Sequence, residues 1–173
     1  MGTQSNLRVQ KAAPEHAEGI ARVCSEGWRD TYRGLHAEAY IERTIREFYN
    51  VERIRREIGQ TGDGWDGWFV ALDGKDVVGA IGGGMTGPEE AEVFVLYLLP
   101  SRRREGIGTM LLDHLTDIQR AKGAKRQWVS VTKGNGKGIP FYEARGFRLA
   151  GEREAHFNPE GEELVSHRYV RDI

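Results

Sequence analysis

The stretch LLPSRRREGIGTMLL, residues 98–112, decides the fold of this chain. A run of apolar residues stops at Pro100, three arginines follow, and Gly106 and Gly108 come directly before a helical pattern. The first N–H groups of a helix have no partner within the helix and carry the positive end of its dipole. Glycines let a bulky anion approach these groups closely, and arginines add donors that suit phosphate oxygens. The stretch therefore predicts a strand, a loop and a helix that together bind a diphosphate.

The alternative interpretation of this stretch is a solvated basic loop in front of a helix, because Gly-x-Gly alone is a weak signal. The stretch is not the dinucleotide fingerprint, since Leu111 stands where a third glycine belongs. It is not a P-loop either, because no Gly-Lys-Ser/Thr follows, and GNGKG at residues 134–138 also lacks the serine or threonine. Other parts of the chain must therefore indicate which anion is bound.

The composition is that of a soluble globular protein with a core: of 173 residues, 39% are hydrophobic and 29% are charged. We expect one domain over residues 1–173, with a disordered tail over residues 1–6. The formal net charge of −1 provides no basic field for nucleic acid or for an acidic membrane surface. The single cysteine, Cys24, cannot form an internal disulfide, and we find neither a membrane-spanning apolar run nor a signal-peptide core. We therefore expect a cytoplasmic protein without nucleic-acid or membrane partners.

Hydrophobic periodicity predicts a series of strands and helices. Residues 91–99 are almost all apolar, as in a strand that is buried on both faces. Asp73-Gly74 between two apolar runs indicates a hairpin. The order of elements predicts an α/β fold with one mixed sheet and helices on both faces. The expected strands lie around residues 7–9, 68–72, 76–85, 91–99 and 128–132, with a final hairpin of 147–157 and 163–170 around Asn158–Gly161. Four helices are expected: one that begins at Pro14, one over 38–58, one over 110–122, and a short one that ends at Gly146.

A second motif follows the strand at 128–132: Asn135, then FYEARGF at residues 141–147. With Arg103-Arg104-Glu105-Gly106-Ile107-Gly108, the chain resembles the GCN5-related N-acetyltransferase (GNAT) family, which has Arg/Gln-x-x-Gly-x-Gly/Ala after its central strand. The order and spacing of the two motifs agree with the family over about residues 7–170. The resemblance implies an α+β fold, with a single, mostly antiparallel sheet of about seven strands that splays at its centre. It also implies an enzyme that uses acetyl-CoA.

The implied reaction is direct attack of a primary amine, of a small molecule or a peptide, on the thioester of acetyl-CoA. The alternative is a non-catalytic module that binds acyl-CoA as a sensor or regulator. The resemblance also implies which residues hold the coenzyme, through backbone groups of the central strand, the diphosphate loop and an asparagine. Asn135 has a further interpretation, as a loop residue that satisfies its own turn. The implied coenzyme-binding residues are Leu96, Leu98, Arg103, Arg104, Gly106, Ile107, Gly108, Thr109 and Asn135.

Two residues are implied to be catalytic, Tyr142 and Glu92. Tyr142 matches the tyrosine that protonates the departing thiolate, and its alternative is a core tyrosine that packs its helix onto the sheet. Glu92 stands where one branch of the family has a catalytic glutamate, which takes the proton of the amine. The alternative is that Glu92 is a strand-end glutamate in water, and that an ordered water path is the base. Ser130 stands where another branch has a glutamate, and a serine is a poor base. That branch's mechanism and its protein N-terminus substrate are therefore in doubt here.

The resemblance implies that the first helices of the chain contact the acceptor amine. Aromatic residues there can hold a cation, and they can equally anchor the helix in the core. Trp28 and Tyr32 are the candidate acceptor-binding residues. The histidines have no metal-ligand spacing, so we expect no metal. The C-terminal hairpin is a candidate surface for a homodimer. The histidines in question are His36, His114, His156 and His167.

Overall fold

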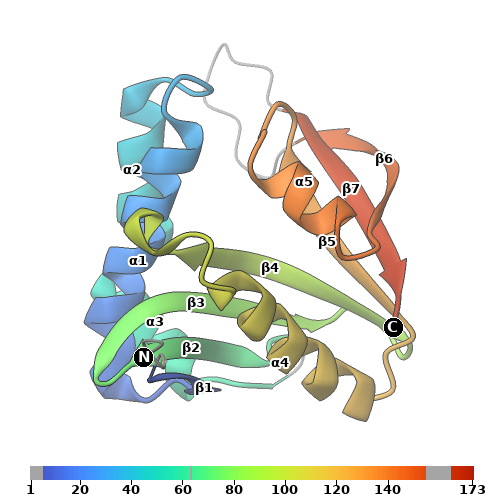
Figure 1. Cartoon of the computed structure of the whole chain (residues 1–173), viewed down its shortest axis with the longest axis horizontal. Helices are drawn as coiled ribbons and strands as arrows, with labels where there is room; N and C mark the ends of the chain where they lie inside the picture. The colour runs from blue at the N-terminus through green and yellow to red at the C-terminus, as the bar shows by residue number, and fades with distance from the viewer. Residues whose placement is uncertain (1–5, 63, 155–164) are drawn as a thin grey trace, which may run out of the picture.

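The computed structural model describes residues 6–62, 64–154 and 165–173. Seven strands form one sheet in the order β1-β2-β3-β4-β5-β7-β6, and only β4 and β5 are parallel neighbours in this described sheet (Figure 1). This confirms the predicted mixed, mostly antiparallel sheet. The predicted turn at Asn158–Gly161 and the tail over 1–5 lie outside the described residues. The strands are β1 (Leu7–Lys11), β2 (Gly67–Asp73), β3 (Asp76–Met85), β4 (Glu90–Leu98), β5 (Arg126–Thr132), β6 (Arg148–Glu154) and β7 (Val165–Asp172).

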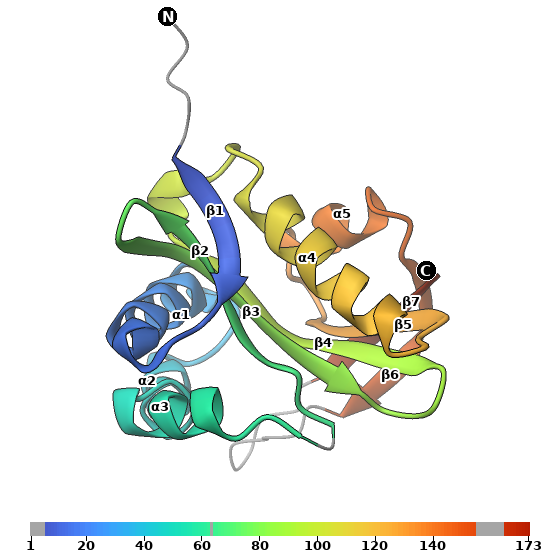
Figure 2. The same cartoon turned by 90° about the horizontal axis from the view of Figure 1, so that it is seen from below.

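Helices cover both faces of the sheet, as predicted (Figure 2). α1 packs on β3 and β4 from one side, and α4 packs on β2, β3 and β4 from the other. The core on the α1 side includes Cys24, which is fully buried, and burial raises the pKa of its thiol, so the side chain stays neutral and apolar. The helices are α1 (Ala17–Tyr32), α2 (Glu38–Phe48), α3 (Val51–Gly59), α4 (Ile107–Ala121) and α5 (Gly138–Glu143), with short 3-10 turns at Pro14–His16 and Pro100–Arg102.

The helix predicted over residues 38–58 is two helices, so that prediction was wrong. α2 ends at Phe48 and α3 begins at Val51. Asn50 caps the second helix, because its Oδ1 accepts the N–H of Arg53 at 2.8 Å. An asparagine at this position favours a new helix start over a continued helix.

The prediction that residues 91–99 are buried on both faces was wrong for the second half of the strand. β5 pairs with β4 only along Glu90–Val93, and the two strands then diverge (Figure 1). A β-bulge in β4 also interrupts its pairing with β3, since Gly82 pairs with Val95 and Gly83 with Val93. The extra residue, Phe94, is 48% exposed. The strand is apolar along its length because its far half lines a cleft.

Candidate active site

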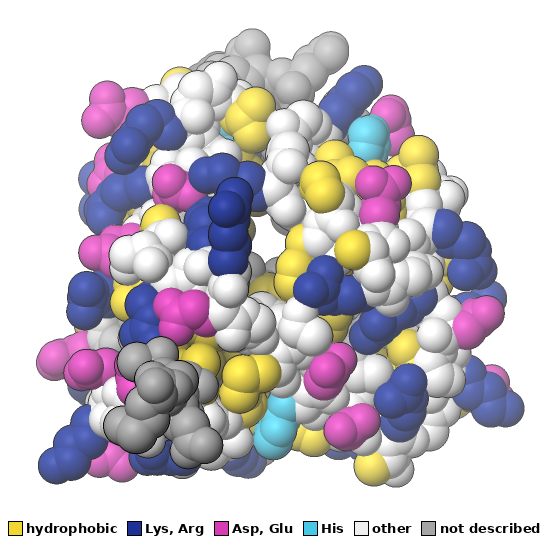
Figure 3. All heavy atoms as spheres, viewed as in Figure 1, with side chains coloured by type: hydrophobic (Ala, Val, Ile, Leu, Met, Phe, Trp, Pro, Cys, Tyr) yellow, Lys and Arg dark blue, Asp and Glu magenta, His cyan; other side chains and the backbone are white. Residues whose placement is uncertain are grey.

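A cleft opens where β4 and β5 separate, lined by α1, β4, the loop after β4, β5 and α5. Figure 3 shows the surface hollowed at the centre of this face, with Lys and Arg side chains at the rim. Within the described residues, the edge of β4 that faces the cleft has backbone groups without a strand partner beyond Val93. Leu99 N–H donates to Val78 O at 2.9 Å, and antiparallel ladders alternate between bonded and non-bonded pairs. The alternation turns the N–H and C=O of Leu98 and Leu96 away from β3 and toward the cleft.

The N-terminus of α4 lies at the cleft and has unused donors. Gly106 is the N-cap, with φ of 80°, and no side chain caps the helix. The first helical bond runs from Met110 N–H to Gly106 O at 3.0 Å, which leaves the N–H groups of Ile107, Gly108 and Thr109 without partners in the helix. A Cβ built on Gly106 would meet nothing within 4 Å. The open space and the aligned donors are what an anion at a helix start requires.

The three residues that follow Gly106 fix the helix start in place. A Cβ on Gly108 would lie 3.0 Å from Phe141 of α5, so a glycine permits this close approach of the two helices. The Thr109 hydroxyl accepts a hydrogen bond from Arg145 Nε at 3.0 Å. Ile107 is buried in the core. These contacts tie the start of α4 to α5, so the side chains of this motif position the loop, and its main chain faces the cleft.

The three arginines of the loop have different surroundings. Arg102 is paired with Asp73 at 3.1 Å and with Glu105 at 2.7 Å, which ties the loop to the β2–β3 hairpin. Arg103 lines the cleft and is hydrogen-bonded to Asp30 of α1. Arg104 is exposed and has φ of 69°, a left-handed conformation that is uncommon for a residue other than glycine.

Asn135 lies in the turn after β5 and lines the cleft. Its Oδ1 accepts the N–H groups of Lys137 and Gly138 at 3.1 and 2.9 Å. The alternative that Asn135 satisfies its own turn is therefore seen in the structure. The two interpretations are compatible, because Asn135 lines the cleft and, within the described residues, its Nδ2 makes no hydrogen bond.

Tyr142 of α5 is buried, 8% exposed, and lines the cleft. Phe141 and Phe147 pack edge-on against its ring, with centroids 5.1 and 5.3 Å away. Burial, and to a lesser degree Tyr32, raises the pKa of the Tyr142 phenol. The hydroxyl therefore keeps its proton at neutral pH and is available as a donor.

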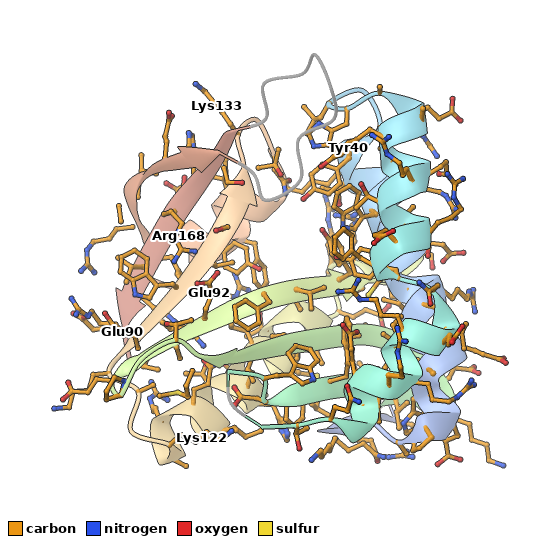
Figure 4. The ribbon with its side chains drawn as sticks, turned by 180° about the vertical axis from the view of Figure 1, so that it is seen from behind. Tyr40, Glu90, Glu92, Lys122, Lys133 and Arg168 are labelled. Atoms are coloured by element: carbon orange, nitrogen blue, oxygen red, sulfur yellow. The ribbon has the colours of Figure 1, made fainter. Side chains whose placement is uncertain are left out.

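Glu92 does not stand alone on β4. Both carboxylate oxygens are paired with Arg168 of β7, at 2.9 and 3.0 Å, and Arg168 also donates to Ser130 Oγ of β5 at 2.8 Å. Figure 4 shows the glutamate and the arginine side by side, with Glu90 farther along the strand. The guanidinium also lies 5.0 Å from the ring of Trp128. This cluster connects β4 to β7 across β5, just before β4 and β5 diverge.

A second polar cluster holds the strands together on the opposite face of the sheet. Gln119 of α4 donates to Glu92 O at 3.1 Å and accepts from Gln127 of β5 at 2.9 Å. Arg171 of β7 donates to Gln127 Oε1 at 2.9 Å. Both Gln side chains are fully buried. The point at which the strands diverge is thus fixed from both faces, which sets where the cleft begins.

The two acceptor candidates lie in different places. Tyr32 lines the cleft, and its hydroxyl is 3.4 Å from that of Tyr97 and 3.5 Å from Thr132 Oγ1. Trp28 packs among aromatic side chains of α1 and α2, with its ring centroid 4.2 Å from that of Tyr32 and 6.3 Å from that of Tyr40. Tyr40 is labelled in Figure 4. The structure brings Tyr32 to the cleft and gives Trp28 surroundings typical of a helix anchor.

The model of the Acetyltransferase (GNAT) family matches residues 26–147. The chain belongs to the GNAT family. A spermidine N(1)-acetyltransferase of Thermoplasma acidophilum is 31% identical over 145 residues, which are 83% of this chain and 89% of that protein. The crystal structure of PaiA N-acetyltransferase from Thermoplasma acidophilum, in complex with coenzyme A, matches with a TM-score of 0.81 and 26% identity, over 97% of this chain and 99% of that chain. A GCN5-related N-acetyltransferase from Rhodopseudomonas palustris shares the fold, with a TM-score of 0.76 and 21% identity over 100% and 98% of the two chains.

These relatives confirm the predicted family and fold, and this GNAT protein is an acetyl-CoA-dependent N-acetyltransferase. The roles of individual residues stay predictions. In the part of the chain described by the structure, no helix is long and apolar enough to span a membrane.

Sequence reasoning missed two charged residues of the GNAT site, Arg168 and Lys137. Arg168 pairs with a residue 76 positions away, and no local pattern encodes such a contact. The sequence could have indicated Lys137 as a site residue, because it lies two residues after Asn135 of the second motif.

Proposed function

We propose that this acetyltransferase transfers the acetyl group of acetyl-CoA to a primary amine of a small molecule or peptide by direct attack. The amine nitrogen forms the new C–N bond to the thioester carbon, an oxyanion forms on the acetyl group, and the C–S bond breaks as this oxyanion collapses. The amine loses a proton, and the thiolate gains one. The observation that carries the proposal is the position of Tyr142. Its buried hydroxyl lines the same cleft as the outward-facing backbone of Leu96 and Leu98. A donor in that position can protonate the thiolate of a coenzyme arm that lies along β4.

The coenzyme arm is proposed to hydrogen-bond to the free edge of β4 as an added strand would, and the diphosphate to lie at the start of α4. Leu98 N–H is proposed to stabilise the oxyanion that forms on the acetyl group. Arg103, Gly106 and Asn135 are proposed to contact the coenzyme. No feature of the site favours the alternative of a non-catalytic sensor, and the relatives named above are enzymes.

An acceptor screen tests the proposed reaction. Release of free thiol from acetyl-CoA is followed with spermidine, with smaller diamines and with a peptide that begins with alanine. Spermidine is included because a relative matched over 83% of this chain is named for it, and the peptide because shorter matches are to ribosomal-protein alanine acetyltransferases. We expect turnover with at least one small-molecule amine. Thiol release that no amine accelerates above the rate of hydrolysis would overturn the proposal.

Glu92 is proposed to take up the proton of the amine through an ordered water, because its own oxygens are already paired with Arg168. We expect Glu92→Gln to lower turnover by about 10- to 100-fold, at the low end of the range for a proton-transfer group. Coenzyme A affinity should change little, since glutamine keeps the size of the side chain and can still accept from Arg168. The measurement is kcat at saturating amine, at a temperature well below the unfolding midpoint of the variant.

Glu90→Gln is the matched control. Glu90 lies two residues earlier on the same strand and pairs with Arg126 at 2.8 Å, with its side chain 26% exposed. We expect this variant to have the turnover of the unmodified enzyme. If the two variants had equal rates, Glu92 would not be the base.

A further inference from the structure

Two cations from opposite sides of the cleft share one carboxylate. Asp30 lies near the end of α1, and its Oδ2 accepts a hydrogen bond from Lys137 Nζ at 2.7 Å. The same oxygen is bonded to the guanidinium of Arg103. Arg103 follows β4 and Lys137 follows β5, and both line the cleft. The ionic contact therefore crosses the cleft beyond the point where the two strands have diverged.

This contact adds little to the stability of the fold. The side chains of Asp30, Arg103 and Lys137 are 32%, 37% and 52% exposed. Ion pairs at such exposure contribute little to stability. The hydrogen bond from Lys137, and then the charge of Arg103, lower the pKa of Asp30, so the carboxylate is ionised at neutral pH. An anion with more oxygens and more charge can replace it at low cost.

The turn that carries Lys137 is held so that the side chain projects to the cleft. Asn135 Oδ1 accepts the N–H of Lys137, which fixes its backbone. Lys133 is four residues earlier in the same segment, and its Nζ lies 3.8 Å from Glu152 of β6 instead. Figure 4 labels Lys133 at the outer end of β5, pointing away from the cleft. Two lysines of one turn thus have opposite orientations, and Lys137 is the one that lines the cleft.

We propose that Lys137 is a further coenzyme-binding residue, and that Asp30 pairs with the two cations, Arg103 and Lys137, that the coenzyme diphosphate takes over when it binds. When the coenzyme binds, its diphosphate takes over the hydrogen bonds that Arg103 and Lys137 make to the carboxylate. Each phosphate oxygen forms a charge-assisted bond like those of the carboxylate, and the diphosphate also meets the free N–H groups of α4. Asp30 is then an internal competitor that limits affinity. This inference rests on the proposed position of the coenzyme.

The proposal predicts opposite effects for two substitutions, which isothermal calorimetry of coenzyme A binding can measure without turnover. Lys137→Met should weaken coenzyme A binding by about 10- to 100-fold, as the loss of a hydrogen bond to a charged group implies. Asp30→Asn should tighten it by about 2- to 5-fold, because the competing charge is removed. Lys133→Met is the matched control and should stay within about twofold. Equal effects of the two lysine variants, or unchanged or weaker binding by Asp30→Asn, would overturn the proposal.

Two coenzyme fragments locate the contact. Dephospho-coenzyme A keeps the diphosphate and lacks the 3′-phosphate, so the loss caused by Lys137→Met should be the same as with coenzyme A. Pantetheine has no phosphate, and the variant should bind it as the unmodified enzyme does. A loss that disappears with dephospho-coenzyme A would overturn the assignment to the diphosphate. If the unmodified enzyme failed to bind coenzyme A at all, the proposed coenzyme site would fail before any variant was compared.

Discussion

Replacing Tyr142 by phenylalanine is expected to lower turnover by about 10- to 100-fold while coenzyme A affinity stays within about twofold. The phenol is buried, and its raised pKa keeps it protonated, so the enzyme has a neutral donor at the cleft. Phenylalanine preserves the edge-on packing against Phe141 and Phe147 and removes only the hydroxyl. The thiolate would then depart without a proton, which raises the barrier of the chemical step. The measurement is kcat with the best amine of the screen, together with calorimetry of coenzyme A.

Tyr169→Phe provides the control for loss of a buried hydroxyl. Tyr169 of β7 is 3% exposed and belongs to the same core as Tyr142. Burial raises its pKa as well, but it does not line the cleft. We expect this variant to keep full turnover. Tyr142→Phe with the turnover of the unmodified enzyme across the amine panel would show that Tyr142 only packs α5 onto the sheet.

The pH profile gives a second measurement on Tyr142. An acid must hold its proton to act, and a raised pKa means that the proton is held to higher pH. Turnover of the unmodified enzyme should therefore show no loss from ionisation of this group up to the ordinary tyrosine pKa of about 10. A decline below pH 9 that is absent in Tyr142→Phe would contradict this prediction.

The parts of the fold that the sequence predicts are those with a local cause. The loop and helix around Gly106 are visible because glycine, arginine and apolar spacing all occur within one stretch, although α4 begins at Ile107 and not at the predicted residue 110. The break between α2 and α3 was missed although it also has a local signal, the cap at Asn50. In that segment the apolar periodicity continued through the break and outweighed the cap.

The parts that the sequence could not predict depend on contacts between distant segments. Apolar residues on β4 look the same in a core and in a cleft, so the exposure of Phe94 is decided by where β5 stops pairing. The pairing of Glu92 with Arg168 likewise requires β7 to lie beside β5. Residue types at the site were therefore predictable, but which charges neutralise one another was not.

Replacing Gly106 by valine is expected to weaken coenzyme A binding by at least about 100-fold, about 2.7 kcal/mol. Gly106 has φ of 80°, which a β-branched residue adopts only with strain. A new backbone angle would turn the first N–H groups of α4 away from the anion. If the angle were kept, the side chain would fill the open space above the helix start, where the diphosphate is proposed to lie. Both routes lead to loss of binding, measured by calorimetry alongside thermal unfolding.

Gly123→Val separates this loss from general damage to the helix. Gly123 follows the other end of α4, has φ of 101°, and a Cβ there would lie at an ordinary 3.5 Å from Pro88 O. The backbone strain in the two variants is of the same kind, so both should unfold at lower temperature. Only the variant at the start of α4 should lose coenzyme affinity, because only there do backbone donors and open space coincide. Equal losses of affinity in both variants would mean that the integrity of α4, and not the loop that begins it, controls binding. Full affinity in Gly106→Val would place the diphosphate elsewhere.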